Sequence, residues 1–294
     1  MRLLVVVVAL LLGCRGEPKP APPKQQPMTE RASVEAQGSA AADPWAAEPK
    51  SDPSDPPSFG ERKKLADEAC PLVKGPYFYR IEKAGKVSHI LGTRHVGVAL
   101  DKMPKPVHDA ISSAKLAVFE VAPGDDSDLP EQKIVLRDAL GPDLHKRYQV
   151  LVGEHTAQAL ESTTPSVAVL AMMVMYEDLS AMLDVEIQNR FQAAKVPTRG
   201  LESSEFQDRL LNKVLDLRML KAAVQHTEDR AELQTESRKD LAEYCAGTDD
   251  KPGMDDEMRA ELLASGYTEA ELQKIDEEMV FARNTDWIPK LEKI

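Results

Sequence analysis

The sequence predicts an α/β domain in which a central mixed sheet carries a large helical insertion. Three short, mostly apolar segments, at residues 86–91, 115–121 and 194–202, are typical of strands, and each leads into a turn or a helical pattern. From about residue 129 to residue 194 the apolar residues recur at helical spacing instead. Because the carboxyl ends of parallel strands meet at one edge of a sheet, we expect residues that end these strands to lie close together.

Turn and capping signals place the remaining elements. Residues 61–69 are expected to form an opening helix, residues 77–81 to pair with 86–91 as a β-hairpin, and residues 106–114 to form another helix. The apolar stretch 167–176, with three methionines, is expected to be a buried core helix rather than a cofactor pocket. Further helix starts are indicated by proline and by capping residues: Pro165, Ser204 with Gln207, and Thr268 with Glu271.

The N-terminal residues 1–14 have the composition of a targeting segment. Arg2 precedes a run of ten apolar residues, which is too short to span a bilayer because spanning needs about 20. The run ends in Leu11-Leu12-Gly13-Cys14, which resembles a bacterial lipobox. We therefore expect a lipoprotein signal peptide and a Cys14 that carries fatty acyl chains such as palmitate. An ordinary cleaved signal peptide is the alternative.

Composition separates a tether from the folded domain and limits the partners. Residues 15–60 are rich in Pro, Ala, Lys, Glu and Ser, which predicts a disordered tether ahead of a domain at 61–294. The net charge of −12 argues against nucleic acid as a partner. The lipid would attach the protein to a membrane of the bacterial cell envelope. Arg15 is not the aspartate that usually retains lipoproteins at the inner membrane, so we expect the outer membrane, facing the periplasm or the cell surface.

Two cysteines remain once Cys14 is lipidated, Cys70 and Cys245. An extracytoplasmic compartment is oxidising, which favours a disulfide between them. Two unpaired buried thiols are the alternative.

A glycine-flanked turn after the strand at 86–91 carries His95. Gly92 and Gly97 permit backbone angles that other residues avoid, so the imidazole can face a cleft. Glu120 and Glu202 end the next two strands and would lie along the same sheet edge. One imidazole and two carboxylates can bind a divalent metal that activates water, or can act directly as general acid and base.

Each candidate residue also has a structural interpretation. A lone histidine is most often a satisfied structural residue, Glu120 can pair with an arginine, and Glu202 can favour the N-terminus of the next helix. Arg283 can clamp a carboxylate through two hydrogen bonds or lie on the surface of the last helix.

In their order and spacing, these motifs resemble the TraB/GumN family, which includes the Tiki-type metalloproteases. The resemblance covers about residues 76–294 and implies an α/β fold akin to haem-binding ChaN and the erythromycin esterases. It implies a metal-dependent hydrolase, in Tiki proteins a protease acting on peptide or protein. The implied catalytic residues are His95, Glu120, Glu202, Arg283 and Asn284, with His95 and Glu120 as ligands of Mn²⁺, Co²⁺ or Zn²⁺. The matching pieces are Leu91-Gly92-Thr93-Arg94-His95-Val96-Gly97, Val118-Phe119-Glu120-Val121, Leu183-Asp184-Val185-Glu186-Ile187, Gly200-Leu201-Glu202-Ser203 with Gln207, and Arg283-Asn284 with Trp287.

The chain departs from the family pattern at its C-terminal end. Family members continue past the helix that holds Trp287 into a strand with a second G-x-x-H motif and a final helix, whereas no histidine follows His226 here. The expectation is therefore a C-terminally truncated chain, a fragment or a degenerate member with a binding role. We expect little hydrolase activity and a bare sheet edge that promotes self-association. The alternative function is a non-enzymatic envelope lipoprotein that binds a peptide, haem or a protein.

Overall fold

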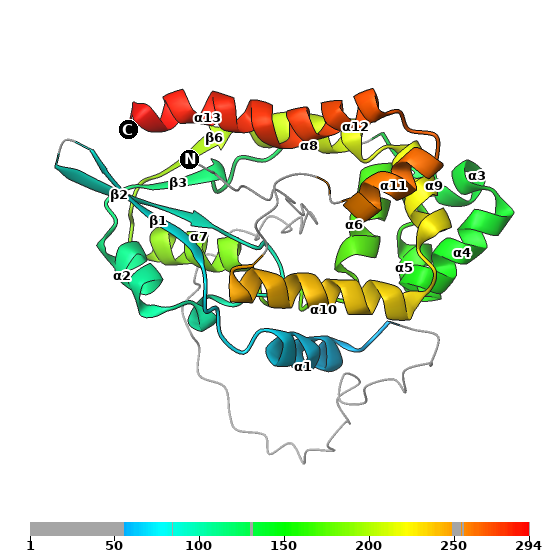
Figure 1. The fold of residues 1–294 in the computed structure, drawn as a ribbon, viewed down its shortest axis with the longest axis horizontal. Helices are drawn as coiled ribbons and strands as arrows, with labels where there is room; N and C mark the ends of the chain where they lie inside the picture. The colour runs from blue at the N-terminus through cyan, green and yellow to red at the C-terminus, as the bar shows by residue number, and fades with distance from the viewer. Residues whose placement is uncertain (1–55, 84, 130–131, 249–253, 255, 294) are drawn as a thin grey trace, which may run out of the picture.

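The computed structural model describes residues 56–83, 85–129, 132–248, 254 and 256–293 (Figure 1). The predicted signal peptide, Cys14 and nearly all of the predicted tether lie outside these residues. Among the described residues, no helix is both long and apolar enough to cross a bilayer.

The fold is α/β with a large helical content, as the sequence predicts, but its strands are short. The described strands pair in three two-stranded ladders rather than in the one central sheet that the sequence predicts. An antiparallel hairpin pairs β1 (Tyr77–Lys83) with β2 (Lys86–Gly92), and β3 (Ala117–Val121) pairs in parallel with β6 (Thr198–Glu202). The third ladder joins the two-residue strands β4 (Ile134–Val135) and β5 (Ser162–Thr163).

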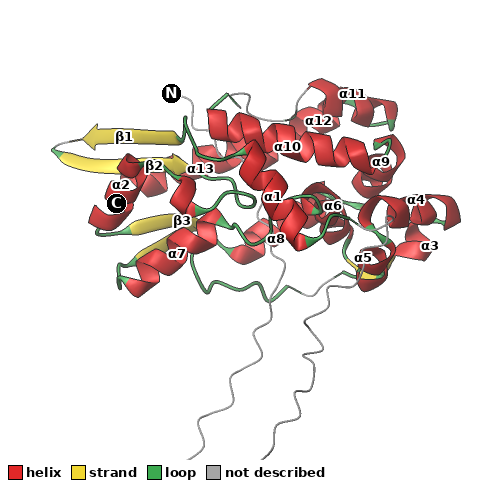
Figure 2. Cartoon of the chain, turned by 90° about the horizontal axis from the view of Figure 1, so that it is seen from below, coloured by secondary structure: helices red, strands yellow, loops and turns green. Residues whose placement is uncertain are grey.

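The strands that lead to the candidate residues point in one direction. The arrowheads of β2, β3 and β6 point toward the same side of the molecule (Figure 1), and the hairpin and β3 lie at the end of the molecule away from α3 and α4 (Figure 2). Gly200 allows β6 to approach β3 closely, because a Cβ at this position would lie 2.7 Å from the backbone nitrogen of Ala122. The parallel pairing therefore brings the ends of two acid-bearing strands together.

The crossover from β3 to β6 is the helical insertion that the sequence predicts. Thr164 caps α6 by accepting a hydrogen bond from Val167, and Pro165 occupies its first turn. Most of α6 is buried, which agrees with the predicted core helix, although Met173 is exposed. The helices of this crossover are α3 (Leu136–Leu140), α4 (Pro142–Val152), α5 (Glu154–Ala159), α6 (Pro165–Val174) and α7 (Leu183–Ala193).

Helices outside the crossover complete two hydrophobic cores. The first core lies among α4, α6 and α9, with Tyr148, Leu151 and Leu220 fully buried, and the second joins α1, α2, α7 and α10 beside the hairpin. These helices are α1 (Phe59–Ala69), α2 (Lys105–Ser113), α8 (Ser204–Val214), α9 (Leu217–His226), α10 (Arg230–Ala246), α11 (Asp256–Ala264), α12 (Glu269–Asp276) and α13 (Ala282–Glu292), with a 3-10 turn at Leu100–Lys102.

Two capping predictions have different outcomes. Thr268 and Glu271 form a reciprocal capping box at the start of α12, as predicted. The prediction for α8 is wrong by one residue, because Ser203 is the N-cap and its hydroxyl accepts from the Phe206 N–H at 3.2 Å. The predicted last long helix is also interrupted, since a π-helical turn, Glu277–Phe281, separates α12 from α13.

A disulfide joins Cys70 at the end of α1 to Cys245 in α10, with the two Cα atoms 5.7 Å apart. The bridge closes a loop of 175 residues, and both cysteines are buried. The Lys74 N–H also donates to the Cys245 carbonyl at 2.7 Å, which holds the segment before β1 against α10.

Removing this bridge should strongly lower stability. Cross-links over long loops restrict the unfolded chain, and loss of a native disulfide typically costs about 2–5 kcal/mol. A Cys70→Ser/Cys245→Ser double variant should therefore melt well below the parent chain. Mass spectrometry without reductant, with thiol alkylation, checks the bridge directly, and two alkylated cysteines in the folded parent chain would contradict it.

Candidate active site

The turn after β2 is anchored by two hydrogen bonds to other parts of the chain. The Gly97 N–H donates to the Ala181 carbonyl at 2.8 Å, and the Tyr244 hydroxyl donates to the Gly92 carbonyl at 3.0 Å. Gly97 has a φ of 89°, which L side chains rarely adopt. A Cβ at Gly97 would also lie 3.2 Å from a carboxylate oxygen of Glu177. Glycine is thus required at this position, and the turn presents His95 in a fixed place.

His95 forms an ion pair with Asp184 in the first turn of α7. Its Nδ1 hydrogen bonds to Asp184 Oδ2, and the Thr93 hydroxyl donates to Asp184 Oδ1 at 2.6 Å. Burial disfavours the imidazolium, but the charge and hydrogen bond of Asp184 outweigh burial and raise the pKa of His95. Burial likewise opposes ionisation of Asp184, yet the charge and hydrogen bond of His95 hold the pKa of Asp184 below its usual value.

The second ring nitrogen of His95 remains available. Because Nδ1 is bound to Asp184, Nε2 is the atom left for chemistry, and it is buried without a hydrogen-bond partner in the part of the chain that the structure describes. Such a carboxylate contact fixes the tautomer and the orientation of a ring.

Arg283 of α13 lies between the two candidate carboxylates. Its Nε donates to Glu202 Oε2 at 3.0 Å, and its Nη2 donates to Glu120 Oε2 at 3.1 Å and to Glu202 Oε1. Gln207 Nε2 lies 3.3 Å from Glu202 Oε1 and 3.4 Å from Glu120 Oε2. Arg283 is only 3% exposed and stacks over the Trp287 ring at 4.8 Å. The structure thus matches the clamp interpretation of Arg283 and not the surface one.

Local backbone features hold in place the clamp, the set formed by Arg283, Glu120 and Glu202. Arg283 follows the π-helical turn, and its Nη1 donates to the Met279 carbonyl at 3.3 Å within that turn. π-Helical turns often occur at functional sites, where they redirect side chains. The Asp125 carboxylate accepts from the Ser204 N–H at 3.2 Å and so binds the N-terminus of α8, which follows Glu202 in the chain.

Glu120 is more exposed than Glu202, and its own pKa is raised. The Glu120 side chain is 22% exposed, whereas the Glu202 side chain is 4% exposed. Burial raises the pKa of Glu120 to about 7, while the charges of Arg283 and His95 oppose the shift and those of Glu202 and Asp184 add to it. Glu120 is therefore the more exposed of the two carboxyl groups, and burial favours its protonated form.

A divalent metal would find an incomplete ligand set here. His95 Nε2 and Glu120 are two donors, whereas a catalytic zinc site usually uses three protein ligands. No group of three or more His, Cys, Asp or Glu side chains within the described residues is arranged to hold a metal. The Arg283 guanidinium already lies against both glutamates. The residues present do not fit a complete metal site, and metal binding by His95 and Glu120 stays a prediction.

The sequence was compared with models of known protein families. Residues 77–294 match the sequence model of the TraB/PrgY/gumN family. The chain belongs to this family. The matched region begins at the first residue of β1 and contains every residue of the site described above. Comparisons with curated proteins and with solved structures gave no match.

Three of the five predicted catalytic residues of this TraB/PrgY/gumN protein are joined by direct hydrogen bonds. The clamp brings Glu120, Glu202 and Arg283 together, and His95 lies near enough for its charge to act on Glu120. Asn284 follows Arg283 in α13 and is partly buried.

Two residues in this TraB/PrgY/gumN site had no role predicted from the sequence. Asp184 lies in the matching piece at 183–187, and Thr93 lies in the turn before His95, but neither stood out by residue type. A carboxylate in the first turn of a helix is ordinary in itself. Its contact with a histidine 89 residues away depends on how α7 packs against the turn.

Proposed function

We propose that this protein is a cell-envelope hydrolase in which Glu120 and His95 act as general base and general acid on a peptide bond. The observation that supports this best is the pairing of a partly exposed carboxyl group, with a pKa of about 7, and a histidine oriented by Asp184. Groups that exchange protons near the working pH are the most effective acid–base catalysts.

In this mechanism the ionised Glu120 removes a proton from water, and the resulting hydroxide attacks the carbonyl carbon. The His95 imidazolium then gives its Nε2 proton to the leaving amine as the carbon–nitrogen bond breaks. Asp184 stabilises the imidazolium and keeps Nε2 directed away from α7. Arg283 and Gln207 hold the Glu120 carboxylate in place and are positioning residues.

Replacing Asp184 by Asn should separate its positioning role from a structural one. The amide keeps the shape but removes the charge, so the pKa of His95 should fall and the imidazolium should be lost at lower pH. We expect kcat/KM to fall about 100-fold at pH 8, and the alkaline limb of the pH profile to move to lower pH. The matched control is Asp138→Asn on α3, outside the site. An unchanged pH profile with normal melting temperature would contradict the role of Asp184.

A metal-assisted version of the same reaction is tested by chelation. Metal-bound histidines commonly donate their other ring N–H to a carboxylate, as His95 can to Asp184. Activity that is lost to a chelator and restored by Mn²⁺, Co²⁺ or Zn²⁺ would favour the metal. Activity that resists the chelator would favour direct acid–base chemistry.

A binding function is the second candidate. The hydrogen bonds that Glu120 and Glu202 already accept within the protein favour it. Arg283 and Gln207 donate hydrogen bonds to both glutamates. A network with a purely structural role would make the same contacts. The two candidates are separated by incubating the full chain with a peptide library between pH 6 and 9. Cleavage that disappears in Glu120→Gln supports the hydrolase, whereas peptide retention without cleavage supports a binding protein.

The cell envelope is proposed as the site of action for two reasons. Leu11-Leu12-Gly13-Cys14 resembles a lipobox, and the Cys70–Cys245 disulfide is typical of an oxidising compartment. Lipid on Cys14 would then place the domain at a membrane surface, with the peptide or protein substrate in the same compartment.

Lipidation makes a direct prediction. Cells that express the chain and receive a clickable fatty-acid analogue should label the parent protein but not a Cys14→Ser variant. The control is the Cys70→Ser/Cys245→Ser variant, which keeps Cys14 and should label normally. Equal labelling of the parent chain and Cys14→Ser would rule out this attachment site.

A further inference from the structure

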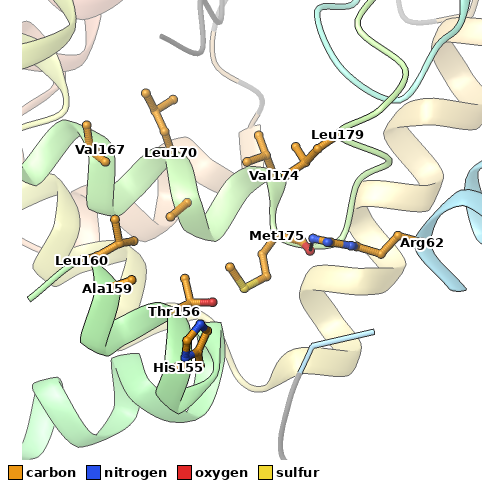
Figure 3. Close-up of a pocket in the computed structure, with 11 residues that line it drawn as sticks. Arg62, His155, Thr156, Ala159, Leu160, Val167, Leu170, Val174, Met175 and Leu179 are labelled. Carbon is orange, nitrogen blue, oxygen red and sulfur yellow. Dashed lines mark hydrogen bonds between the residues drawn. The ribbon is translucent and has the colours of Figure 1, made fainter. Parts of the chain in front are cut away.

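A cavity of about 270 Å³ lies between α1, α5 and α6 and shares no lining residue with the site around His95 (Figure 3). Its walls are mainly apolar, with Leu160 at the end of α5 and Val167, Leu170 and Val174 along α6. The cavity opens to the surface beside His155 and Ala159, which are exposed, whereas Leu170, Val174 and Met175 of its lining are buried. An open apolar space of this size therefore suits an apolar ligand.

One end of the cavity carries a charged group with an unused donor. Arg62 reaches from α1 toward Met175, and its Nη1 donates to the Met175 carbonyl at 2.9 Å (Figure 3). Its Nε is buried and has no hydrogen-bond partner within the described residues. A buried donor left unpaired is unfavourable, and an acceptor oxygen from a ligand would remove that penalty.

The carboxylate whose charge acts on Arg62 is Asp178, and it accepts hydrogen bonds from another residue. Burial lowers the pKa of the Arg62 guanidinium, and the charge of Asp178 opposes that shift. The Asp178 carboxylate itself accepts hydrogen bonds from the backbone and hydroxyl of Ser180, at 3.0 and 2.5 Å. Asp178 therefore acts on Arg62 over a distance and leaves the Nε donor for another anion.

We propose that this cavity binds a medium-chain fatty acid, with its carboxylate on Arg62 and its acyl chain along α6. The guanidinium of arginine matches the planar geometry of a carboxylate, and the apolar walls match an unbranched hydrocarbon chain. Since an apolar cavity of about 150 Å³ holds benzene, the volume here has room for about ten non-hydrogen atoms. That number corresponds to octanoate.

The test measures binding of octanoate to the full chain by isothermal titration calorimetry. Burying one methylene contributes about fourfold in affinity, so hexanoate should bind about 15-fold more weakly than octanoate. Arg62→Met keeps an apolar side chain but removes the charge, and it should weaken octanoate binding at least tenfold. It should leave the binding of uncharged 1-octanol unchanged.

Two further variants complete the design. Arg137→Met removes an arginine whose side chain is 68% exposed and lies outside the cavity, and it should bind octanoate like the parent chain. Ala171→Phe should fill the cavity and abolish binding of both probes. Melting curves with and without octanoate provide a second readout, since a ligand of the folded state raises the melting temperature.

Absence of octanoate binding by the parent chain up to about 1 mM would overturn the proposal. Equal weakening of octanoate and 1-octanol in Arg62→Met would overturn the assignment of the carboxylate to Arg62. Binding that survives Ala171→Phe would place the ligand elsewhere. None of these measurements depends on peptide hydrolysis.

Discussion

Glu120→Gln and His95→Asn are each expected to lower kcat/KM for peptide hydrolysis by about 10²–10⁴-fold, the range for loss of a general acid or base. The glutamine cannot accept a proton from water but can still accept hydrogen bonds from Arg283 and Gln207. The asparagine can still donate to Asp184, so the turn should keep its main contact. Both variants should therefore remain folded, and steady-state kinetics with melting curves measures the two effects separately.

The matched controls for these variants are Glu154→Gln and His155→Asn, which change exposed residues of α5 outside the site. Both controls should keep the kcat/KM of the parent chain. If Glu120→Gln or His95→Asn also retains full activity, that residue is not the acid or base.

Arg283→Met is expected to destabilise the domain by about 3–5 kcal/mol, the cost of breaking a buried ion pair by removing one partner. The change leaves the buried Glu202 carboxylate without its fork of donors and Glu120 without its cation. Arg80→Met is the control, because the Arg80–Glu82 pair is exposed and should contribute at most about 1 kcal/mol. Urea denaturation of the parent chain and the two variants measures the difference.

The destabilisation by Arg283→Met should depend on pH in a defined direction. With Arg283 absent, the pKa of Glu120 should lie even further above its unfolded value of 4.5. A group with a raised folded pKa contributes stability at low pH and loses it as pH rises through the folded pKa. The difference between Arg283→Met and the parent chain should therefore be larger at pH 8 than at pH 5. A difference that is constant across this range would contradict the coupling of Glu120 to Arg283.

Sequence patterns predict the parts of the site that depend on local geometry. The hairpin, the parallel strands that end in Glu120 and Glu202, and the glycine-flanked turn at His95 all follow from residue order and turn chemistry. The disulfide follows from the small number of cysteines and the expected compartment. The strands, the hairpin and the turn are each predicted from one short segment of the sequence.

The remaining features depend on long-range packing and could not be predicted in the same way. The contact between Asp184 and His95 joins segments 89 residues apart. The burial of Arg283 depends on a π-helical turn that no local pattern indicated. The separation of the strands into three ladders is also a matter of long-range packing, since the strand segments themselves have the pattern of parts of one sheet.

The pH dependence of peptide hydrolysis tests the central claim most directly. Measured from pH 5 to 10 on the full chain, kcat/KM should rise as pH passes about 7, because Glu120 must lose its proton to act as the base. It should fall again at alkaline pH, because His95, whose pKa is raised, must keep its proton to act as the acid. The rising limb at about 7 should be absent from the residual activity of Glu120→Gln. A rising limb near 4.5, or one that persists in Glu120→Gln, would contradict the assignment of Glu120 as the general base.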